Sequence, residues 1–295
     1  MSKTSLSQSR LFALQNCGEF YRRKYVEGDH RPGTLRMHRG GAVHEAAREA
    51  HKRQVLAKKE AFSSESDAEK DEVREVLRTS VPSLDESESI ASDAFDHGVL
   101  QGVVIHSDDV SKAGSKDLAV GRQKDMAVAM AGHYNLFVAP EVNPVAFERR
   151  ITVDTTTSSG DEVVLQGILD LVEERLDTGE VIVPDLKTTE RTPPKDQADK
   201  SEQLTFYATL RLAETGKLPD AALLRSLVSK SGVVQVVERT TRVTEGDVDA
   251  MLARVDSAVK AINAGIFVPA YPGSWMCSAK WCQYFSDCRF ALQRR

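Results

Sequence analysis

Cysteine is scarce in this chain of 295 residues: there are four in all, and Cys17 is the one cysteine before position 277. No apolar run approaches the roughly 20 residues of a membrane span, and the polar start MSKTSLSQSR has no signal-peptide core. These absences argue against a disulfide-stapled secreted domain and against a membrane protein. They predict a protein of the cytoplasm.

An excess of positive charge is also missing, since the formal net charge is −5. That sign argues at first against a nucleic-acid partner, but the charges are unevenly placed. Residues 60–93 hold eleven acidic and three basic side chains, whereas residues 17–53 hold nine Lys or Arg against five acids. The basic run Arg22, Arg23 and Lys24 is flanked by aromatic residues. It fits a surface that binds a nucleic-acid backbone, and equally a solvated helix face.

The most informative stretch, residues 166–189, reads as two strands of β-branched and aliphatic residues joined by a turn at 176–179. With a two-residue loop, Asp170 faces Asp185, and the alternation of side chains puts Lys187 on the same face. Carboxylates this close repel unless a cation lies between them, and Mg²⁺ or Mn²⁺ prefers oxygen ligands. A three-residue loop would shift the register by one and leave the carboxylates as diagonal neighbours, which a metal could still bridge. Taken alone, a D-x-K motif is commoner on an ordinary exposed hairpin.

The remaining patterns predict an α/β fold with a mixed central sheet flanked by helices, in one domain spanning 1–295. We expect a helix from Ser5 past Cys17, a second helix starting after Gly40-Gly41, a helix over 125–139, a strand over 145–154, a helix over 197–216, a hairpin turning at Ser231-Gly232 and a capped helix from Thr244. Residues 57–125 are acidic and weakly periodic, which predicts an insertion of short helices and mobile loops.

His44, Arg48 and His51 share one face of the predicted second helix, because they are spaced by four and three residues. Arg48 stands where the H-E-x-x-H motif of zinc proteases requires its second histidine, so that class of site is excluded. Considered alone, His44 is more typical of a hydrogen-bonded histidine than of a ligand. We assign His51 a structural role.

The C-terminal segment 266–295 contains Cys277, Cys282 and Cys288 with the spacing C-x4-C-x5-C. Disulfides are disfavoured in a reducing cytoplasm, and four thiolates together with Cys17 suit a structural zinc or an iron–sulfur cluster. Zinc sites are built mostly from closely paired cysteines, so one distant cysteine and three grouped cysteines favour an iron–sulfur cluster over zinc. A simply buried Cys17 is the alternative. Either metal would join the N-terminal helix to the C-terminal segment in a structural role.

Six short motifs occur in order along the chain: S-x-S-R-L-x5-C ending at Cys17, G-A-V-H at 41–44, Q-G-I-L-D at 166–170, P-D-L-K at 184–187, Q-L-T-F-Y at 203–207 and the three C-terminal cysteines. Together they resemble a RecB-type nuclease of the PD-(D/E)xK superfamily, in the branch with a four-cysteine 4Fe-4S cluster that includes CRISPR-associated adaptation nucleases and phage exonucleases. The resemblance covers residues 5–53 and 145–290 and leaves the acidic insertion outside it. It implies a restriction-endonuclease-like core.

The resemblance also implies roles for individual residues. His44, Asp170 and Asp185 would bind Mg²⁺ or Mn²⁺, with the backbone carbonyl of Leu186 as a further ligand. Lys187 would position or activate the attacking water and stabilise charge on the phosphate. Asp185 stands where many relatives have Glu, and the C-x4-C spacing is wider than the C-x2-C common in relatives.

Three further residues follow from the same resemblance: Gln203 and Tyr207 would line the groove and hold the DNA strand or the lysine, and Glu148 would be an acid behind the metal ligands. The function implied is a metal-dependent deoxyribonuclease, an exonuclease on single-stranded DNA or DNA ends, for phage or bacterial DNA recombination or degradation. It would act in the host cytoplasm if a phage encodes it, with recombination or adaptation proteins as partners. The alternatives are a CRISPR-type spacer-processing nuclease and a non-catalytic DNA-end-binding iron–sulfur module.

Overall fold

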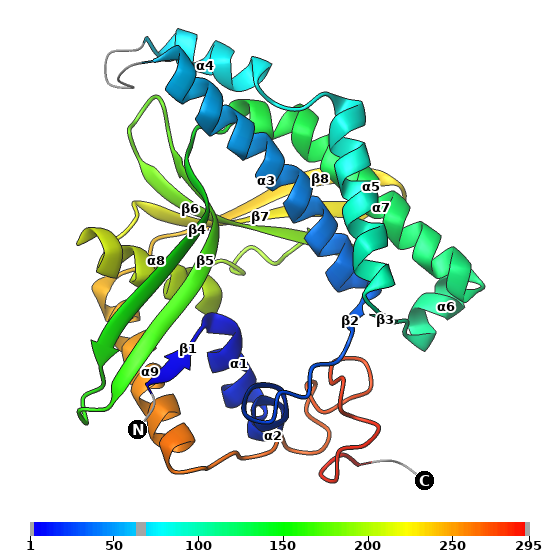
Figure 1. The fold of residues 1–295 in the computed structure, drawn as a ribbon, viewed down its shortest axis with the longest axis vertical. Helices are drawn as coiled ribbons and strands as arrows, with labels where there is room; N and C mark the ends of the chain where they lie inside the picture. The colour runs from blue at the N-terminus through cyan, green and yellow to red at the C-terminus, as the bar shows by residue number, and fades with distance from the viewer. Residues whose placement is uncertain (1–2, 63–68, 293–295) are drawn as a thin grey trace.

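A mixed sheet forms the centre of the computed structural model, which describes residues 3–62 and 69–292 (Figure 1). Its main strands are β4 (Pro144–Thr156), β5 (Glu162–Glu174), β6 (Val181–Thr189), β7 (Ala221–Lys230) and β8 (Val233–Thr241). Neighbours in this series pair antiparallel except β6 and β7, which are parallel, and the short β1 (Thr4–Leu6) pairs parallel with β5. β7 is buried along most of its length, as its nearly continuous apolar sequence indicates, whereas β8 is an edge strand. The predicted α/β fold with a mixed central sheet is confirmed.

Helices cover both faces of this sheet. One face carries α3 (Leu35–Ala61), α5 (Leu84–Leu100) and α7 (Lys116–Phe137), and the other carries α1 (Gln8–Asn16), α8 (Glu202–Thr215) and α9 (Glu245–Asn263). Smaller elements are α4 (Lys70–Thr79), α6 (Ser107–Ala113), a 3-10 turn at Ala139–Glu141 and the parallel pair β2 (Gly33–Thr34) and β3 (Val103–Val104). Leu186 of β6 packs against the α3 side, and Val183 packs against the α8 side. No helix in the described residues is long and apolar enough to cross a membrane.

The N-terminal helix differs from the prediction, because it starts later and breaks at Cys17. Ser5 lies in β1, and Ser7 is the residue that caps α1. Cys17 has extended backbone angles, φ −161° and ψ 103°, and its Sγ accepts the amide of Phe20 at the start of α2 (Gly18–Tyr21). A π-helical turn, Arg22–Val26, follows. The apolar spacing continues across the break, so periodicity alone predicts one helix.

The prediction that the second helix starts only after Gly40-Gly41 is also wrong. α3 runs for 27 residues and passes straight through both glycines. Each glycine costs a helix about 1 kcal/mol relative to alanine. Packing of Val43, Ala47 and Ala50 against the main core outweighs that cost.

The acidic residues 57–125 form regular helices where the sequence predicted short helices and mobile loops. α5 is 17 residues long, begins with a capping box at Ser83 and buries Ala91 and Phe95 completely. Its acidic side chains lie mainly on the outer face, which hid the apolar stripe from a reading based on charge. Residues 63–68 of this stretch are outside the described part of the chain.

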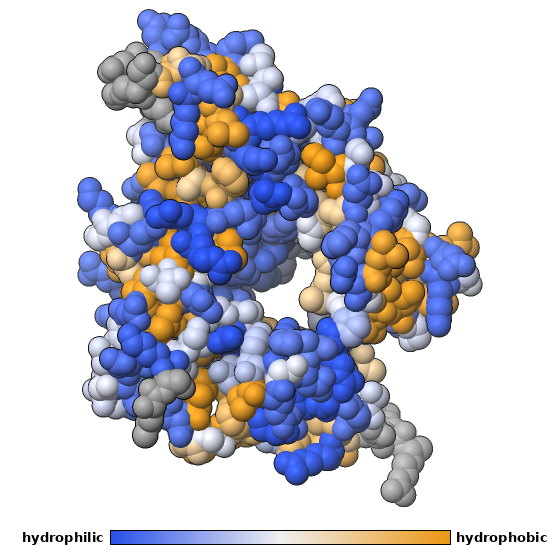
Figure 2. All heavy atoms as spheres, viewed as in Figure 1, coloured by the Kyte–Doolittle hydropathy of each residue, from blue (hydrophilic) through white to orange (hydrophobic). Residues whose placement is uncertain are grey.

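The segment after α9 has no regular structure and folds back onto the N-terminal helices. The amide of Gly18 donates to the carbonyl of Val268 at 2.7 Å, and the amide of Ala270 donates to Cys17 Sγ at 3.3 Å. In the space-filling view an opening passes through the molecule, with the sheet and α3 on one side and the terminal segments on the other (Figure 2).

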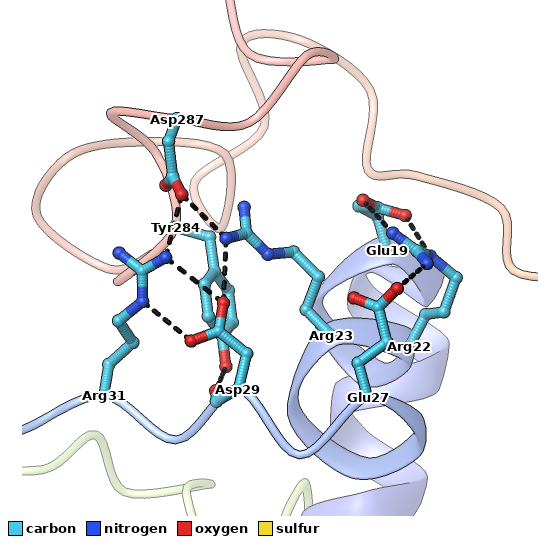
Figure 3. Close-up of polar contacts among 8 residues, drawn as sticks. All are labelled: Glu19, Arg22, Arg23, Glu27, Asp29, Arg31, Tyr284 and Asp287. Atoms are coloured by element: carbon cyan, nitrogen blue, oxygen red, sulfur yellow. Dashed lines mark hydrogen bonds and ion pairs between the residues drawn. The ribbon is translucent and has the colours of Figure 1, made fainter.

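A cluster of ion pairs fixes this C-terminal segment to residues 27–34, the strap that leads into α3, and to the turn before it (Figure 3). This cluster, here named the latch, consists of Arg23, Asp29, Arg31 and Asp287. Asp287 accepts hydrogen bonds from Arg23 at 2.7 Å and from Arg31 at 2.8 Å, and the same two arginines bind Asp29. The ring of Tyr284 lies 4.4 Å from the Arg23 guanidinium. Hydrogen bonds from the two arginines lower the pKa of Asp287 to about 2. The latch therefore stays charged at every physiological pH.

Candidate active site

The hairpin of β5 and β6 has the register that the sequence predicts. Glu173 pairs with Ile182 and Glu174 with Val181, which is the alignment that brings Asp170 opposite Asp185. The turn comprises residues 176–179 in place of the predicted two residues. At its base the amide of Arg175 donates to the carbonyl of Glu180 at 2.9 Å. The structure records no further backbone pair between these two strands in its described residues. Beyond these two pairs a gap separates β5 from β6. The carboxylate of Asp170 spans this gap, and its Oδ2 accepts the amide of Leu186 at 3.1 Å.

His44 reaches this gap from α3. Its Nδ1 lies 3.4 Å from Asp170 Oδ1, and its Nε2 lies 2.9 Å from the carbonyl oxygen of Leu186. Burial alone would lower the pKa of His44, but the hydrogen bond and the charge of Asp170 outweigh burial and raise it. Burial likewise disfavours the Asp170 carboxylate, but the contacts with His44 and the Leu186 amide lower its pKa below the ordinary value. Both partners of His44 are acceptors, so the imidazole satisfies both when it is protonated.

Asp185 and Lys187 flank Leu186 in β6 and lie on one face of that strand, as their alternation in the sequence predicts. Lys187 Nζ lies 2.7 Å from Asp185 Oδ2 and donates to Gln203 Oε1 at 2.8 Å. Gln203 Nε2 in turn donates to the hydroxyl of Tyr207 at 2.9 Å. Burial raises the pKa of Asp185 to about 6, with Lys187 opposing the rise and Asp170 adding to it. Tyr207 and Gln203 therefore hold the ammonium group of Lys187 next to a buried carboxyl.

Glu148 lies in β4 where the pairing with β5 skips one position. Phe147 pairs with Leu171 and Arg149 with Leu169, which leaves Glu148 beside Asp170 without a ladder partner. Its backbone has φ +44°, a strained value for a residue with a side chain. Glu148, His44 and Asp170 line a cavity of about 20 Å³, room for roughly one water molecule. Burial, followed by the charge of Asp170, raises the pKa of Glu148.

The donor atoms around the gap suit a hard divalent cation in kind. Two carboxylates, an imidazole and a backbone carbonyl are ligands that Mg²⁺ or Mn²⁺ accepts. Asp185 Oδ2 is buried and is paired with the Lys187 ammonium group at 2.7 Å. The described residues contain no group of three or more His, Cys, Asp or Glu side chains already arranged around a common metal position. His44 in particular is turned toward Asp170 and Leu186.

Comparison with known proteins agrees with this geometry. A family model described as the PD-(D/E)XK nuclease superfamily matches residues 5–289. The chain belongs to this superfamily. The match includes the acidic residues 57–125 and extends through the last cysteine.

The nuclease matches none of the curated proteins, whereas 24 solved chains match it. The structure of the protein SSO0001 is 14% identical, with a TM-score of 0.34 over 61% of this chain and 73% of that one. A candidate exonuclease from Eubacterium rectale is 12% identical, with a TM-score of 0.33 over 79% of this chain and 95% of that one.

The four cysteines of the nuclease are free thiols, each partly buried. Burial, with smaller contributions from the other three cysteines, raises the pKa of Cys282 to about 11. The pKa of Cys277 is raised by burial and by Cys288 and Cys17. Cys17 is thus near enough to influence the pKa of Cys277 and Cys282, but no three cysteines of the described residues are grouped around a common metal position.

The basic run is engaged within the nuclease itself. Arg22 is paired with Glu19 and Glu27, and Arg23 belongs to the latch. Lys24 lies over the rings of Phe20 and Tyr25, at 5.7 and 5.4 Å. A role for these three residues in DNA binding stays a prediction, since the contacts in the structure are with protein groups.

A groove of about 740 Å³ beside Lys187 contains residues that sequence reasoning missed. Phe12 of α1, together with Arg191 and Lys200 of the loop between β6 and α8, lines it. The position of two basic residues in the loop directly after P-D-L-K was an available signal. Phe12 had none, because its place depends on how α1 packs.

Proposed function

We propose that this nuclease is a metal-dependent deoxyribonuclease of the RecB type that hydrolyses phosphodiester bonds, and that it acts as an exonuclease on single-stranded DNA or DNA ends. The observation that carries the proposal is that Asp170 accepts the Leu186 amide where β5 and β6 separate, while the buried carboxylate of the adjacent Asp185 is paired with Lys187. Phage or bacterial DNA recombination or degradation would use this activity. Spacer processing for CRISPR adaptation is the alternative.

His44, Asp170, Asp185 and the carbonyl of Leu186 would hold the Mg²⁺ or Mn²⁺ ion. A bound ion of this kind supplies a low-pKa water and neutralises charge that develops on the phosphate. His44 must be neutral and Asp185 ionised to serve as ligands. Their raised pKa values in the metal-free chain mean that protons compete with the metal at acidic pH.

Lys187 would contact the scissile phosphate. Gln203 and Asp185 hold its ammonium group in place, so the charge is oriented before the substrate arrives. Tyr207 fixes the Gln203 amide through its hydroxyl group. Glu148 would hold a water molecule in the small cavity beside Asp170.

The test uses full-length protein with Mg²⁺ or Mn²⁺, end-labelled linear single-stranded DNA and closed circular single-stranded DNA. We expect loss of the linear DNA alone, and a reduction on the order of a hundred-fold or more in Lys187→Ala. Lys217→Ala, at the far end of α8, is the matched control and keeps full activity. Cutting of the circle would make the protein an endonuclease. Full activity in Lys187→Ala would refute the site, and tight binding without cleavage would identify a DNA-end-binding module.

The four thiols would hold a 4Fe-4S cluster with a structural role. Free cysteines that influence one another electrostatically support this assignment, and structural zinc is the rival. Protein purified without oxygen should be brown, with iron and sulfide in equal amounts, and Cys282→Ser should lose the colour. A colourless preparation with one zinc per chain would decide for zinc.

A further inference from the structure

Phe12, Trp275 and Trp281 form an exposed row of aromatic rings, here named the aromatic row. The centroids of Phe12 and Trp275 are 6.0 Å apart, and those of Trp275 and Trp281 are 5.7 Å apart in an edge-to-face contact. The three residues are 37%, 52% and 56% exposed. Large aromatic side chains gathered on a surface are typical of binding sites.

Anchoring of the C-terminal segment does not account for this exposure. Met276 and Tyr284 are the buried side chains of the segment, and Tyr284 is held further by the latch. Trp275 and Trp281, on either side of Cys277, point outward instead. Their contacts with each other fix the rings and leave about half of each indole open to solvent.

The aromatic row continues directly from the groove at the active site. Phe12 belongs to both, since it lines the groove that also contains Lys187 and Gln203. A nucleic-acid strand that lies in the groove would therefore meet the row as it leaves.

Positive charge accompanies this path. Arg191 of the groove is exposed and forms no ion pair within the described residues, and Lys280 lies 5.6 Å from the ring of Trp281 at the other end. The acidic groove residue Glu202 is paired with Arg254. Lys200 is paired with Asp196, so Arg191 is the groove's available cation.

We propose that the aromatic row is a stacking platform for the bases of single-stranded DNA, whose backbone follows the groove to Lys187. Every base has a π-face, so such a platform binds without sequence preference. Bases in a duplex are already stacked inside the helix, so the platform selects single strands. The inference rests on the proposed nuclease function and deepens it by naming the substrate-binding residues.

Binding can be measured apart from cleavage in a Lys187→Ala background, with anaerobically purified full-length protein and a fluorescein-labelled oligothymidylate. Both tryptophans of the chain lie in the row, so quenching of tryptophan fluorescence by the unlabelled oligonucleotide reports on this surface alone. We expect quenching, and a loss of affinity on the order of ten-fold for Trp275→Ala or Trp281→Ala. Trp275→Phe should recover most of it.

An abasic oligonucleotide of the same length separates stacking from charge. Parent protein should bind it more weakly than oligothymidylate, and Trp275→Ala should reduce that difference in affinity. Phe137→Ala removes an exposed aromatic ring from α7, on another part of the surface, and should bind like the parent protein.

Equal affinity of the parent protein for the abasic and the normal oligonucleotide would overturn the platform, as would unchanged affinity in both tryptophan variants. These binding results do not depend on cleavage. A protein that stacks bases but never cuts DNA would refute the proposed function and leave the platform in place. A protein that cuts linear single strands with an unchanged KM in both tryptophan variants would support the proposed function and refute the platform.

Discussion

His44 and His51 lie on one face of α3, seven residues apart, and their pKa values shift in opposite directions. The carboxylate of Asp170 raises the pKa of His44. His51 is completely buried without an acidic partner, and burial lowers its pKa to about 4. Its Nε2 lies 2.6 Å from the hydroxyl of Tyr134, and its Nδ1 lies 2.8 Å from Gln54 Oε1. The same residue type thus serves as a candidate ligand at one position and a neutral core group at the other.

Replacing His51 with Gln should flatten the pH dependence of stability. His51 takes up a proton near pH 6.5 in the unfolded chain but only near pH 4 in the folded chain. Its contribution to the free energy of unfolding is therefore fully present above pH 6.5 and is lost as the pH falls toward 4. The loss amounts to on the order of 3 kcal/mol. Urea unfolding at pH 7.5 and pH 5 should show a smaller difference for His51→Gln than for the parent. His30→Gln, at an exposed histidine, is the control; a parental difference in His51→Gln would contradict the assignment.

At the residue scale, the sequence predicted which side chains meet but not how each is held. The period of two placed Asp185 and Lys187 on one face, and the hairpin register placed Asp170 opposite Asp185. The bond from the Leu186 amide to Asp170 depends on the separation of β5 and β6. The left-handed backbone of Glu148 depends on a skipped pair in the ladder. No pattern in the neighbouring sequence predicts the Leu186–Asp170 hydrogen bond or the backbone conformation of Glu148.

Among the elements, α2 and the C-terminal segment approach each other closely, backbone to backbone, at Gly18. A Cβ on Gly18 would lie 2.5 Å from backbone atoms of Phe267 and Val268, which is too close for either to yield cheaply. Gly18→Ala should therefore displace the segment and lower the melting temperature.

The matched control for this change is Gly41→Ala in α3. A Cβ at Gly41 meets no atom within 4 Å, and alanine favours a helix by about 1 kcal/mol over glycine. Gly41→Ala should melt at the same temperature or higher, as measured by circular dichroism. Equal melting of Gly18→Ala and the parent would show that the segment is not held at this point.

Elements with their own local chemistry were predicted well. The turn at Ser231-Gly232 and the capping box of Thr244 and Asp247 occur as predicted. The break at Cys17 and the continuity of α3 through Gly40-Gly41 were not predicted, because contacts with distant segments decide both. α5 was missed because its acidic outer face dominates the composition.

For the molecule as a whole, the latch joins segments more than 250 residues apart. Asp287→Asn removes the charge that both arginines share and should release the C-terminal segment, with little effect on the main core. Trypsin should then cut at Lys280 and Arg289 faster than in the parent, as followed by mass spectrometry. Asp249→Asn, at an exposed acid on α9, is the control. High salt should mimic the variant, because it screens exposed ion pairs. Equal cleavage rates would show that other contacts, such as the hydrogen bond from Gly18 to Val268, hold the segment without the latch.

The latch also sets an order of assembly during synthesis, because it pairs an early segment of the sequence with a late one. Arg23 and Arg31 emerge from the ribosome more than 250 residues before Asp287. The sheet and its helices can therefore assemble before Arg23 and Arg31 have bound Asp287. Trp275, the neighbour of Phe12 at the mouth of the groove, arrives at the same late stage. The proposed aromatic row is thus assembled from an early and a late segment of the sequence.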